Sequence, residues 1–223
     1  MDDVYLYTSS TYFFTLPKTN PAAPAVGRRE RKRQQTADHL ADTAWTLFEE
    51  RGYDGVTMEA IAEAADVAKG TLYKHFPVKE ALLRHRFHRE LADDMPAMLK
   101  SLARLRSAEA GLKSFLAKSA DWSEPRRDFL SHYVHYRLLE VGAADGLAPE
   151  KRSGLEHLFT SLIAAGQKAG EFRADADAVQ LAEYLQFLYL ASLMRWLHRP
   201  GLDLKREFAA MLDLFLGGLR RAP

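Results

Sequence analysis

The sequence predicts an all-α protein of about nine helices. Apolar residues recur at helical spacing from Arg28 onward, and no long segment alternates apolar and polar residues as a half-buried strand does. Glycines and prolines interrupt this pattern and mark the ends of the helices, notably at Gly52, Pro77, Gly170 and Pro200. With 47% apolar and 27% charged residues, the 223-residue chain is long enough to bury a sizeable core.

The composition excludes several classes of protein. Thirty-one Lys and Arg against thirty Asp and Glu give a net charge of +1, so any basic surface must be local. No cysteine is present, which excludes disulfides, cysteine-ligated zinc and thiol nucleophiles. No apolar run reaches the roughly 18 to 20 residues of a membrane helix, and the start lacks the order of a signal peptide. We therefore expect a cytoplasmic protein with no membrane partner.

The chain divides into three parts. Residues 1–27 combine two aromatic clusters with Pro17, Pro21 and Pro24, and we expect a disordered or weakly ordered tail, although the aromatics could contact a partner. A second hypothesis is that translation starts at Val26, which would leave most of this tail unmade. Residues 28–83 form a predicted small helical domain, and residues 84–223 form a larger one.

The second part begins with a basic run, residues 28–33, which carries five positive charges and one negative charge. It could be an arm in which Arg31 and Arg33 touch phosphate, or simply a solvated charge run. A first helix is predicted from near Thr36 to Arg51, because Leu40, Ala44, Leu47 and Phe48 share one stripe. Gly52 is expected to end it in the left-handed conformation.

Two short helices follow, separated by a tight turn, which is the skeleton of a helix-turn-helix. Thr57 is placed to cap the first, whose apolar face contains Met58 and Ile61. The second runs from about Ala68 to Phe76 and is halted by Pro77. At 100° per residue, Leu72 and Phe76 point one way, while the remaining side chains present hydroxyl, phenol and ammonium groups to solvent.

Positive charge is concentrated on that last helix. Residues 67–79 contain Lys69, Lys74 and Lys79 and no acid, whereas residues 49–66 carry a net charge of −5. Lysines of this kind supply the sequence-independent affinity for DNA phosphates. Gly70 has no Cβ and lets the helix approach DNA closely. Lys79, beside the amides that open the next helix, is expected to hold a phosphate. Each residue alone could be an ordinary solvated side chain.

Residues 34–83 resemble the N-terminal domain of TetR-family transcriptional regulators. The resemblance lies in Gly52-Tyr53, Val56-Thr57, Ile61-Ala62 and Ala68–Phe76, followed by Pro77, Lys79, Glu80 and Leu82. It implies a homodimer that binds a pseudo-palindromic double-stranded operator, with a C-terminal domain that binds a small-molecule inducer. Carried over by position, the DNA-binding residues are Thr57, Ala68, Lys69, Gly70, Thr71, Tyr73, Lys74, His75 and Lys79.

Three positions depart from the family pattern. Asp66 replaces the usual turn glycine, which Asp tolerates because it enters the left-handed region more readily than most residues. Ala68 replaces a Ser or Thr, so the reading helix lacks a capping hydroxyl worth roughly 0.5 to 2 kcal/mol. Val78 replaces a common Ser. These departures affect the details of phosphate contact and leave the motif intact.

Six further helices are predicted in the third part of the chain: from Lys79 to about Arg106, with a bend at Pro96, then near Ser107–Trp122, Pro125–Val141, Pro149–Gly170, Asp175–His198 and Asp203–Leu219. The last two are apolar around most of their circumference, which indicates burial on more than one side.

Two sites are predicted in this C-terminal bundle. An apolar effector cavity with a few polar groups would be lined by Trp122, Phe129, His132, Tyr133, Tyr136, Arg137 and Tyr184. A dimer interface on the last two helices would contain Leu188, Met194, Phe208, Met211, Leu212 and Phe215. In both cases ordinary core packing is the alternative.

The sequence favours a ligand-responsive repressor that binds its operator as a dimer. His85-x-x-His88 and His132-x-x-His135 have a chelating spacing, but neither has an obvious third ligand, so no metal and no cofactor is predicted. A DNA-binding regulator without an inducer, acting through a partner protein, is the alternative. An all-α enzyme is a third hypothesis, which no nucleophile motif, acid pair or phosphate loop supports.

Overall fold

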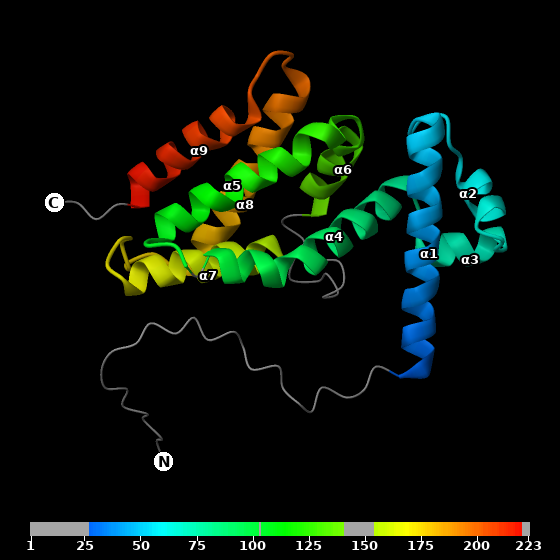
Figure 1. The fold of residues 1–223 in the computed structure, drawn as a ribbon, viewed down its shortest axis with the longest axis horizontal. Coiled ribbons are helices and arrows are strands. Elements are labelled where there is room, and N and C mark those ends of the chain that lie inside the picture. The colour runs from blue at the N-terminus through cyan, green and yellow to red at the C-terminus, as the bar shows by residue number, and fades with distance from the viewer. Residues whose placement is uncertain (1–26, 103, 141–153, 220–223) are drawn as a thin grey trace.

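The computed structural model describes residues 27–102, 104–140 and 154–219. The described part is all-α, as predicted. Its helices, in order, are α1 (Arg28–Arg51), α2 (Met58–Ala64), α3 (Lys69–His75), α4 (Lys79–Leu102), α5 (Ala108–Ser123), a 3₁₀ turn (Glu124–Arg126), α6 (Arg127–Glu140), α7 (Leu155–Lys168), α8 (Ala178–His198) and α9 (Leu204–Leu219). Helices α1 to α3 lie at one end, and α4 leads from them into a body built by α5 to α9 (Figure 1). The predicted tail, the Val26 start and Pro149 lie outside the described residues.

Helix α1 is longer than predicted. It begins at Arg28, where the Arg31 amide donates to the Gly27 carbonyl at 3.0 Å, so the basic run forms its first turns rather than an arm ahead of it. Arg33 pairs with Glu30 at 3.0 Å, one turn apart, and such pairs support a helix. The helix ends at Gly52, whose φ of +73° is the left-handed value expected there.

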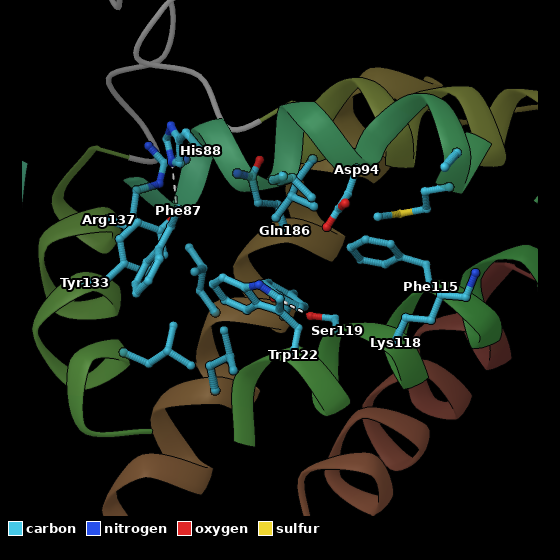
Figure 2. A pocket seen from close by; sticks show the side chains of 18 residues that line it. Phe87, His88, Asp94, Phe115, Lys118, Ser119, Trp122, Tyr133, Arg137 and Gln186 are labelled. Carbon is cyan, nitrogen blue, oxygen red and sulfur yellow. Dashed lines mark hydrogen bonds between the residues drawn. The ribbon is translucent and has the colours of Figure 1, made fainter. Parts of the chain in front are cut away.

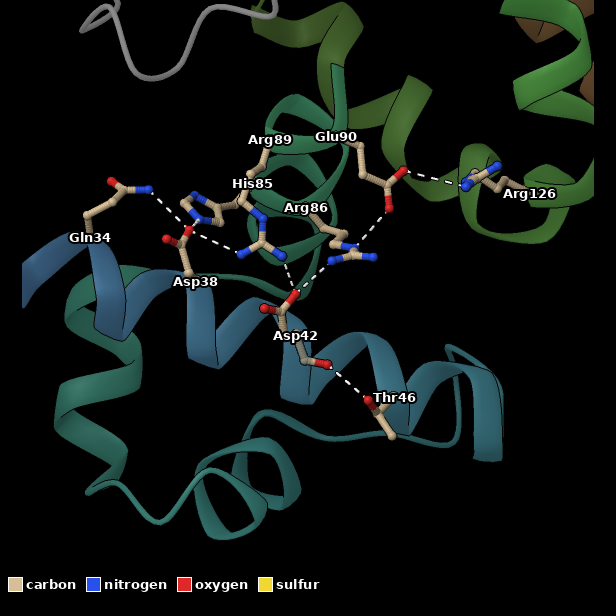
Figure 3. Close-up of polar contacts among 9 residues, drawn as sticks. All are labelled: Gln34, Asp38, Asp42, Thr46, His85, Arg86, Arg89, Glu90 and Arg126. Carbon is tan, nitrogen blue, oxygen red and sulfur yellow. Dashed lines mark hydrogen bonds and ion pairs between the residues drawn. The ribbon is translucent and has the colours of Figure 1, made fainter. Parts of the chain in front are cut away.

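Helix α4 joins the two parts of the molecule, and a charged junction holds it against α1 (Figure 3). Asp38 Oδ1 accepts from His85 Nε2 at 2.7 Å and lies 3.2 Å from Arg89 Nη1. Asp42 Oδ1 lies 2.8 Å from Arg86 Nη1 and also pairs with Arg89. Burial raises the pKa of Asp38, but the hydrogen bonds from His85 and Arg89 outweigh it and leave the pKa below its usual value. The Asp38 carboxylate is therefore held ionised by its partners on α4.

Aromatic rings complete the same junction. Trp45 of α1 meets Phe87 of α4 edge to face, with ring centroids 5.7 Å apart, and lies 4.8 Å from Phe129 of α6. Tyr53, in the loop after α1, stacks on His132 of α6 at 3.9 Å. Helices α4 and α6 thus hold α1 and the loop that follows it.

The helices of the body begin at side-chain caps. Ser107 caps α5 and Asp203 caps α9, as their predicted positions implied. Helix α8 is capped by Asp177, which accepts from the Gln180 amide at 3.0 Å, whereas Asp175 pairs with Arg173. The 24-residue α4 contains Pro96 and ends at Leu102, four residues earlier than predicted.

Three residues predicted for the dimer interface lie inside the chain's own core. Phe208, Met211 and Leu212 are buried on the inner side of α9. Their assignment to the dimer interface is wrong. When a helix is apolar nearly all round, its sequence does not distinguish the side that faces the core from the side that faces the surface. The apolar side chains of α8 and α9 that do reach the surface are Val179, Tyr184, Phe187, Leu188 and Leu214, the last of them 82% exposed.

Gly166 of α7 gives a direct test of this packing. A Cβ at Gly166 would lie 2.3 Å from Cδ2 of Phe172, whose ring is buried. We expect Gly166→Ala to lower the free energy of unfolding by about 1 to 3 kcal/mol in a urea titration, because the overlap exceeds the gain in helix propensity. Gly70→Ala is the matched control, since no heavy atom lies within 4 Å of that Cβ position. Equal stability of both variants would contradict the α7 packing.

Candidate DNA-binding surface and ligand cavity

Helices α2 and α3 form the predicted helix-turn-helix. Thr57 Oγ1 accepts from the Ala60 amide at 3.1 Å and caps α2. The turn between the helices passes through Asp66, which has a φ of +53°, the left-handed value that Asp was expected to accept. Ala68 opens α3 in an extended conformation without a side-chain cap, as its methyl group requires. Residues close in sequence therefore determine the cap of α2, the turn after α2 and the start of α3.

Helix α3 has two distinct sides. Leu72 and Phe76 are buried, and the Phe76 ring lies 5.4 Å from that of His85 in α4, so the inward side is the one predicted. Lys69, Gly70, Tyr73 and Lys74 are exposed, and Thr71 and His75 are half-buried. Because no heavy atom lies within 4 Å of a Cβ placed on Gly70, the protein itself leaves this side of the helix open. The open side carries the donors that suit DNA phosphates and base edges.

A carboxylate that the sequence analysis did not select lies on the same surface. Glu59, in the first turn of α2, has Oε1 3.6 Å from Lys69 Nζ and accepts a hydrogen bond from the Tyr73 hydroxyl at 3.4 Å. Two of the predicted DNA-binding side chains therefore already share one acidic partner. A DNA phosphate would have to compete with Glu59 for Lys69.

The structure gives Lys79 a role that the sequence did not predict. Its Nζ donates to the carbonyls of Tyr53 at 2.9 Å and Val56 at 2.8 Å, and it lies 4.3 Å from the centre of the Tyr53 ring. The ammonium thereby holds the loop between α1 and α2 against the start of α4. Two of its three donors are used by these carbonyls, and contact of Lys79 with a DNA phosphate stays a prediction.

The basic run lies on the N-terminal turns of α1, which extend past α3 (Figure 1). Arg31 and Arg33 are both exposed, and Arg33 pairs with Glu30. A continuous helix therefore carries these guanidinium groups at the same end of the molecule as α3. Their contact with phosphate stays a prediction.

A cavity of about 330 Å³ lies in the body, within the size range of small-molecule sites. It lies among helices α4, α5, α6, α7 and α8 (Figure 2). Its wall is formed by Phe87, His88, Leu91, Asp94, Ala97, Met98, Phe115, Lys118, Ser119, Trp122, Leu130, Tyr133, Arg137, Leu155, Gln186, Tyr189, Leu190 and Leu193. Most of these are apolar or aromatic.

Three of the seven residues predicted for this cavity line it, namely Trp122, Tyr133 and Arg137. The other four lie elsewhere. Phe129 packs on Trp45, and His132 packs on Tyr53, so both lie at the junction with α1. Tyr136 accepts a hydrogen bond from Arg84. Tyr184 is 54% exposed. The predicted placement of Phe129, His132 and Tyr136 is wrong because their sides of α6 contact α1, the loop after α1 and α4 instead of the cavity, and Tyr184 is misplaced because it lies on the outer side of α8.

Polar groups are few in the cavity wall. His88 Nε2 lies 3.0 Å from the Tyr133 hydroxyl, and burial, then the nearby Arg137, lowers the pKa of His88 well below its usual value. The Ser119 and Tyr189 hydroxyls are hydrogen-bonded at 2.7 Å. Sequence reasoning missed His88 and Tyr189, since their only signal was a polar atom on the buried stripe of a helix.

Three histidines of the two pairs contact different partners. His85 pairs with Asp38, His88 with Tyr133 and His132 with the Tyr53 ring. Within the described ranges no three His, Cys, Asp or Glu side chains are grouped as metal ligands. No helix of these ranges has the length and hydropathy to cross a bilayer.

A helix-turn-helix with an open cationic side, joined by one long helix to an all-α body that encloses a cavity, defines a DNA-binding regulator with a separate ligand domain. Comparison with known proteins agrees. Residues 40–85 match the profile of the bacterial regulatory proteins of the tetR family. The N-terminal domain of this chain is therefore similar to that of the TetR-family transcriptional regulators.

Relatives match well beyond the N-terminal domain. The repressor KstR2 of Rhodococcus jostii is 27% identical over 202 residues, which cover 89% of this chain and 96% of that protein. The repressor FadR of Thermus thermophilus, solved with lauroyl-CoA, is 28% identical with a TM-score of 0.70, over 84% of this chain and 97% of that one. RolR, solved with resorcinol, is 25% identical with a TM-score of 0.62, over 82% and 89%.

Two lysines at the ends of the reading surface test the assigned contacts. Lys79→Met removes a donor from two carbonyls and should lower the free energy of unfolding by about 1 to 3 kcal/mol. Lys74→Met should leave stability unchanged and reduce by about one the slope of log affinity for DNA against log salt concentration. Urea titration and fluorescence anisotropy at several salt concentrations measure the two effects. A Lys79→Met protein of unchanged stability but reduced salt slope would instead show that Lys79 contacts a phosphate.

Proposed function

We propose that this protein is a ligand-responsive repressor, which binds a pseudo-palindromic operator as a homodimer and releases it when a small molecule occupies the cavity. It acts on DNA in the cytoplasm. The observation that carries the proposal is the open side of α3, where Lys69, Gly70, Tyr73 and Lys74 face away from the protein while Leu72 anchors the helix. In such a complex each α3 would enter a major groove, with half-sites about one helical turn apart.

A chain of contacts supports coupling between the cavity and the reading domain. Trp122, in the cavity wall, donates from Nε1 to Glu90 at 3.3 Å. Glu90 pairs with Arg86 at 3.0 Å, and Arg86 pairs with Asp42 of α1 at 2.8 Å (Figure 3). A ligand that displaces Trp122 would pull on the junction that orients α1. Since coupling of this kind is reciprocal, operator binding would weaken ligand binding by the same factor.

The exposed apolar side chains of α8 and α9 support the homodimer. Tyr184, Phe187 and Leu188 fall at i, i+3 and i+4 and so share one stripe of α8, while Leu214 lies 82% exposed on α9. Large apolar side chains gathered on one part of a surface mark an interaction site. A second copy of the same two helices would cover them in a symmetric contact.

The relatives support a ligand of apolar character. FadR of Thermus thermophilus was solved with lauroyl-CoA and RolR with resorcinol, and both share the whole fold with this chain. The mostly apolar wall of the cavity fits the same kind of effector. A regulator that works without an inducer would need no such cavity, so the ligand-responsive form is favoured over the alternative.

Selection of bound fragments from the source genome tests DNA recognition. We expect the wild-type protein to enrich fragments that share an inverted repeat. Gly70→Ala should fold normally yet lose at least about tenfold in affinity for these fragments, because a methyl group then meets the DNA. Thermal unfolding provides the folding control. No enriched repeat, or equal binding by Gly70→Ala, would contradict the proposed reading surface.

Leu214→Glu tests the dimer. A carboxylate at this apolar position should disfavour burial in an interface and shift the protein toward monomer in sedimentation equilibrium, with a parallel loss of operator affinity. Leu105→Glu is the matched control, since Leu105 is also exposed but lies between α4 and α5. A dimer unaffected by Leu214→Glu would place the interface elsewhere.

A further inference from the structure

The polar groups of the cavity are unevenly distributed. His88, Tyr133 and Arg137 lie together at one end, while Phe115, Lys118 and Ser119 lie toward the other (Figure 2). Between these ends the wall consists mainly of leucine, methionine and aromatic side chains. A ligand that fills the cavity would therefore meet a mainly apolar middle, with Ser119 and the exposed Lys118 at one end and the buried Arg137 and His88 at the other.

Arg137 is the dominant charge of that end. It is 5% exposed and lines the cavity from α6, where water screens its charge little. A guanidinium has five N–H donors in a planar fork, and two of them match the oxygens of one carboxylate. Arg137 can therefore receive an anionic head group in addition to contacts with its own chain.

The neighbours of Arg137 are uncharged donors and acceptors. His88 is buried, hydrogen-bonded to the Tyr133 hydroxyl through Nε2, and its Nδ1 has no hydrogen-bond partner in the structure. The lowered pKa of His88 keeps the ring neutral. The buried amide of Gln186 adds a further polar group to the wall. Together these groups can hydrogen-bond a carboxylate without adding a second charge.

The other charges of the cavity are weaker. Asp94 and Lys118 both reach the wall, but both side chains are solvent-exposed, and Lys118 Nζ donates to Ser101 Oγ at 3.2 Å. Water screens exposed charges, whereas Arg137 is desolvated. Arg137 is thus the least solvent-screened charge of the cavity wall, and its positive charge favours an anion over a cation.

From this arrangement we infer that the cavity takes an amphipathic monoanion, an apolar body with one carboxylate that pairs with Arg137 beside His88 and Tyr133. The inference rests on the proposed function and gives its effector a chemical class.

Binding of probes matched in their apolar bodies tests the inference. Decanoate, decanol and decyltrimethylammonium share one chain, and 2-naphthoate and 2-naphthol share one ring system. Isothermal titration of the full-length protein, below micelle-forming concentrations, should show one or both acids binding at least about tenfold more tightly than their alcohols, because a charge-assisted pair is stronger than a neutral hydrogen bond. The ammonium probe should bind most weakly.

Two variants locate the effect. Arg137→Gln should abolish the preference for the acid while leaving the affinity for the alcohol unchanged, and Lys118→Gln, at the opposite end of the cavity, should retain the preference. Thermal unfolding shows whether Arg137→Gln folds. If this variant does not fold, the comparison of head groups on the wild-type protein still tests whether the cavity prefers a carboxylate. Alcohols that bind as tightly as acids, a preference for the ammonium, or no binding of either acid would overturn the inference.

Operator binding measured on the same preparation separates this failure from a failure of the proposed function. Intact operator binding without acid preference rejects only the ligand class. Failure of the wild-type protein to bind an operator rejects the proposed repressor function.

Discussion

The junction between α1 and α4 is the contact on which the arrangement of the molecule depends. Two carboxylates of α1, Asp38 and Asp42, face His85, Arg86 and Arg89 of α4, and Trp45 packs beside them on Phe87. Partly buried charges of this kind are stable only while each keeps its partner, so the junction favours one orientation of the two helices. Because α3 packs on α2, which packs on α1, and the cavity is built in part on α4, this orientation relates the reading surface to the ligand site.

Positive charges on the reading domain are also partly paired within the protein. Lys79 is drawn inward by two loop carbonyls, and Lys69 is partly neutralised by Glu59. Arg31 and Lys74 keep their charge toward solvent. The surface presented to DNA is therefore less cationic than the sequence suggests. Discrimination between DNA sequences benefits from this, because weaker phosphate attraction leaves more of the affinity to base contacts.

The sequence predicted what local patterns determine. Leu72 and Phe76 were assigned to the buried side of α3, and Asp66 to the left-handed turn, because each depends on residues only a few positions away. The sequence did not predict that Lys79 donates to the carbonyls of Val56 and Tyr53, which lie 23 and 26 residues earlier in the chain. Similarly, a helical wheel places His132 on one side of α6 but does not say whether the cavity or α1 covers that side. The four misplaced cavity residues and the buried part of α9 share this cause.

The absence of cysteine allows a direct measurement of the junction. Spin labels attached to Ala64→Cys, an exposed position at the end of α2, report the distance between the reading domains in the proposed homodimer. The account predicts one narrow distance distribution in double electron–electron resonance, which broadens when Asp38→Asn and Asp42→Asn remove the carboxylates. An equally narrow distribution in the variant would show that the ion pairs do not fix the orientation of the reading domain.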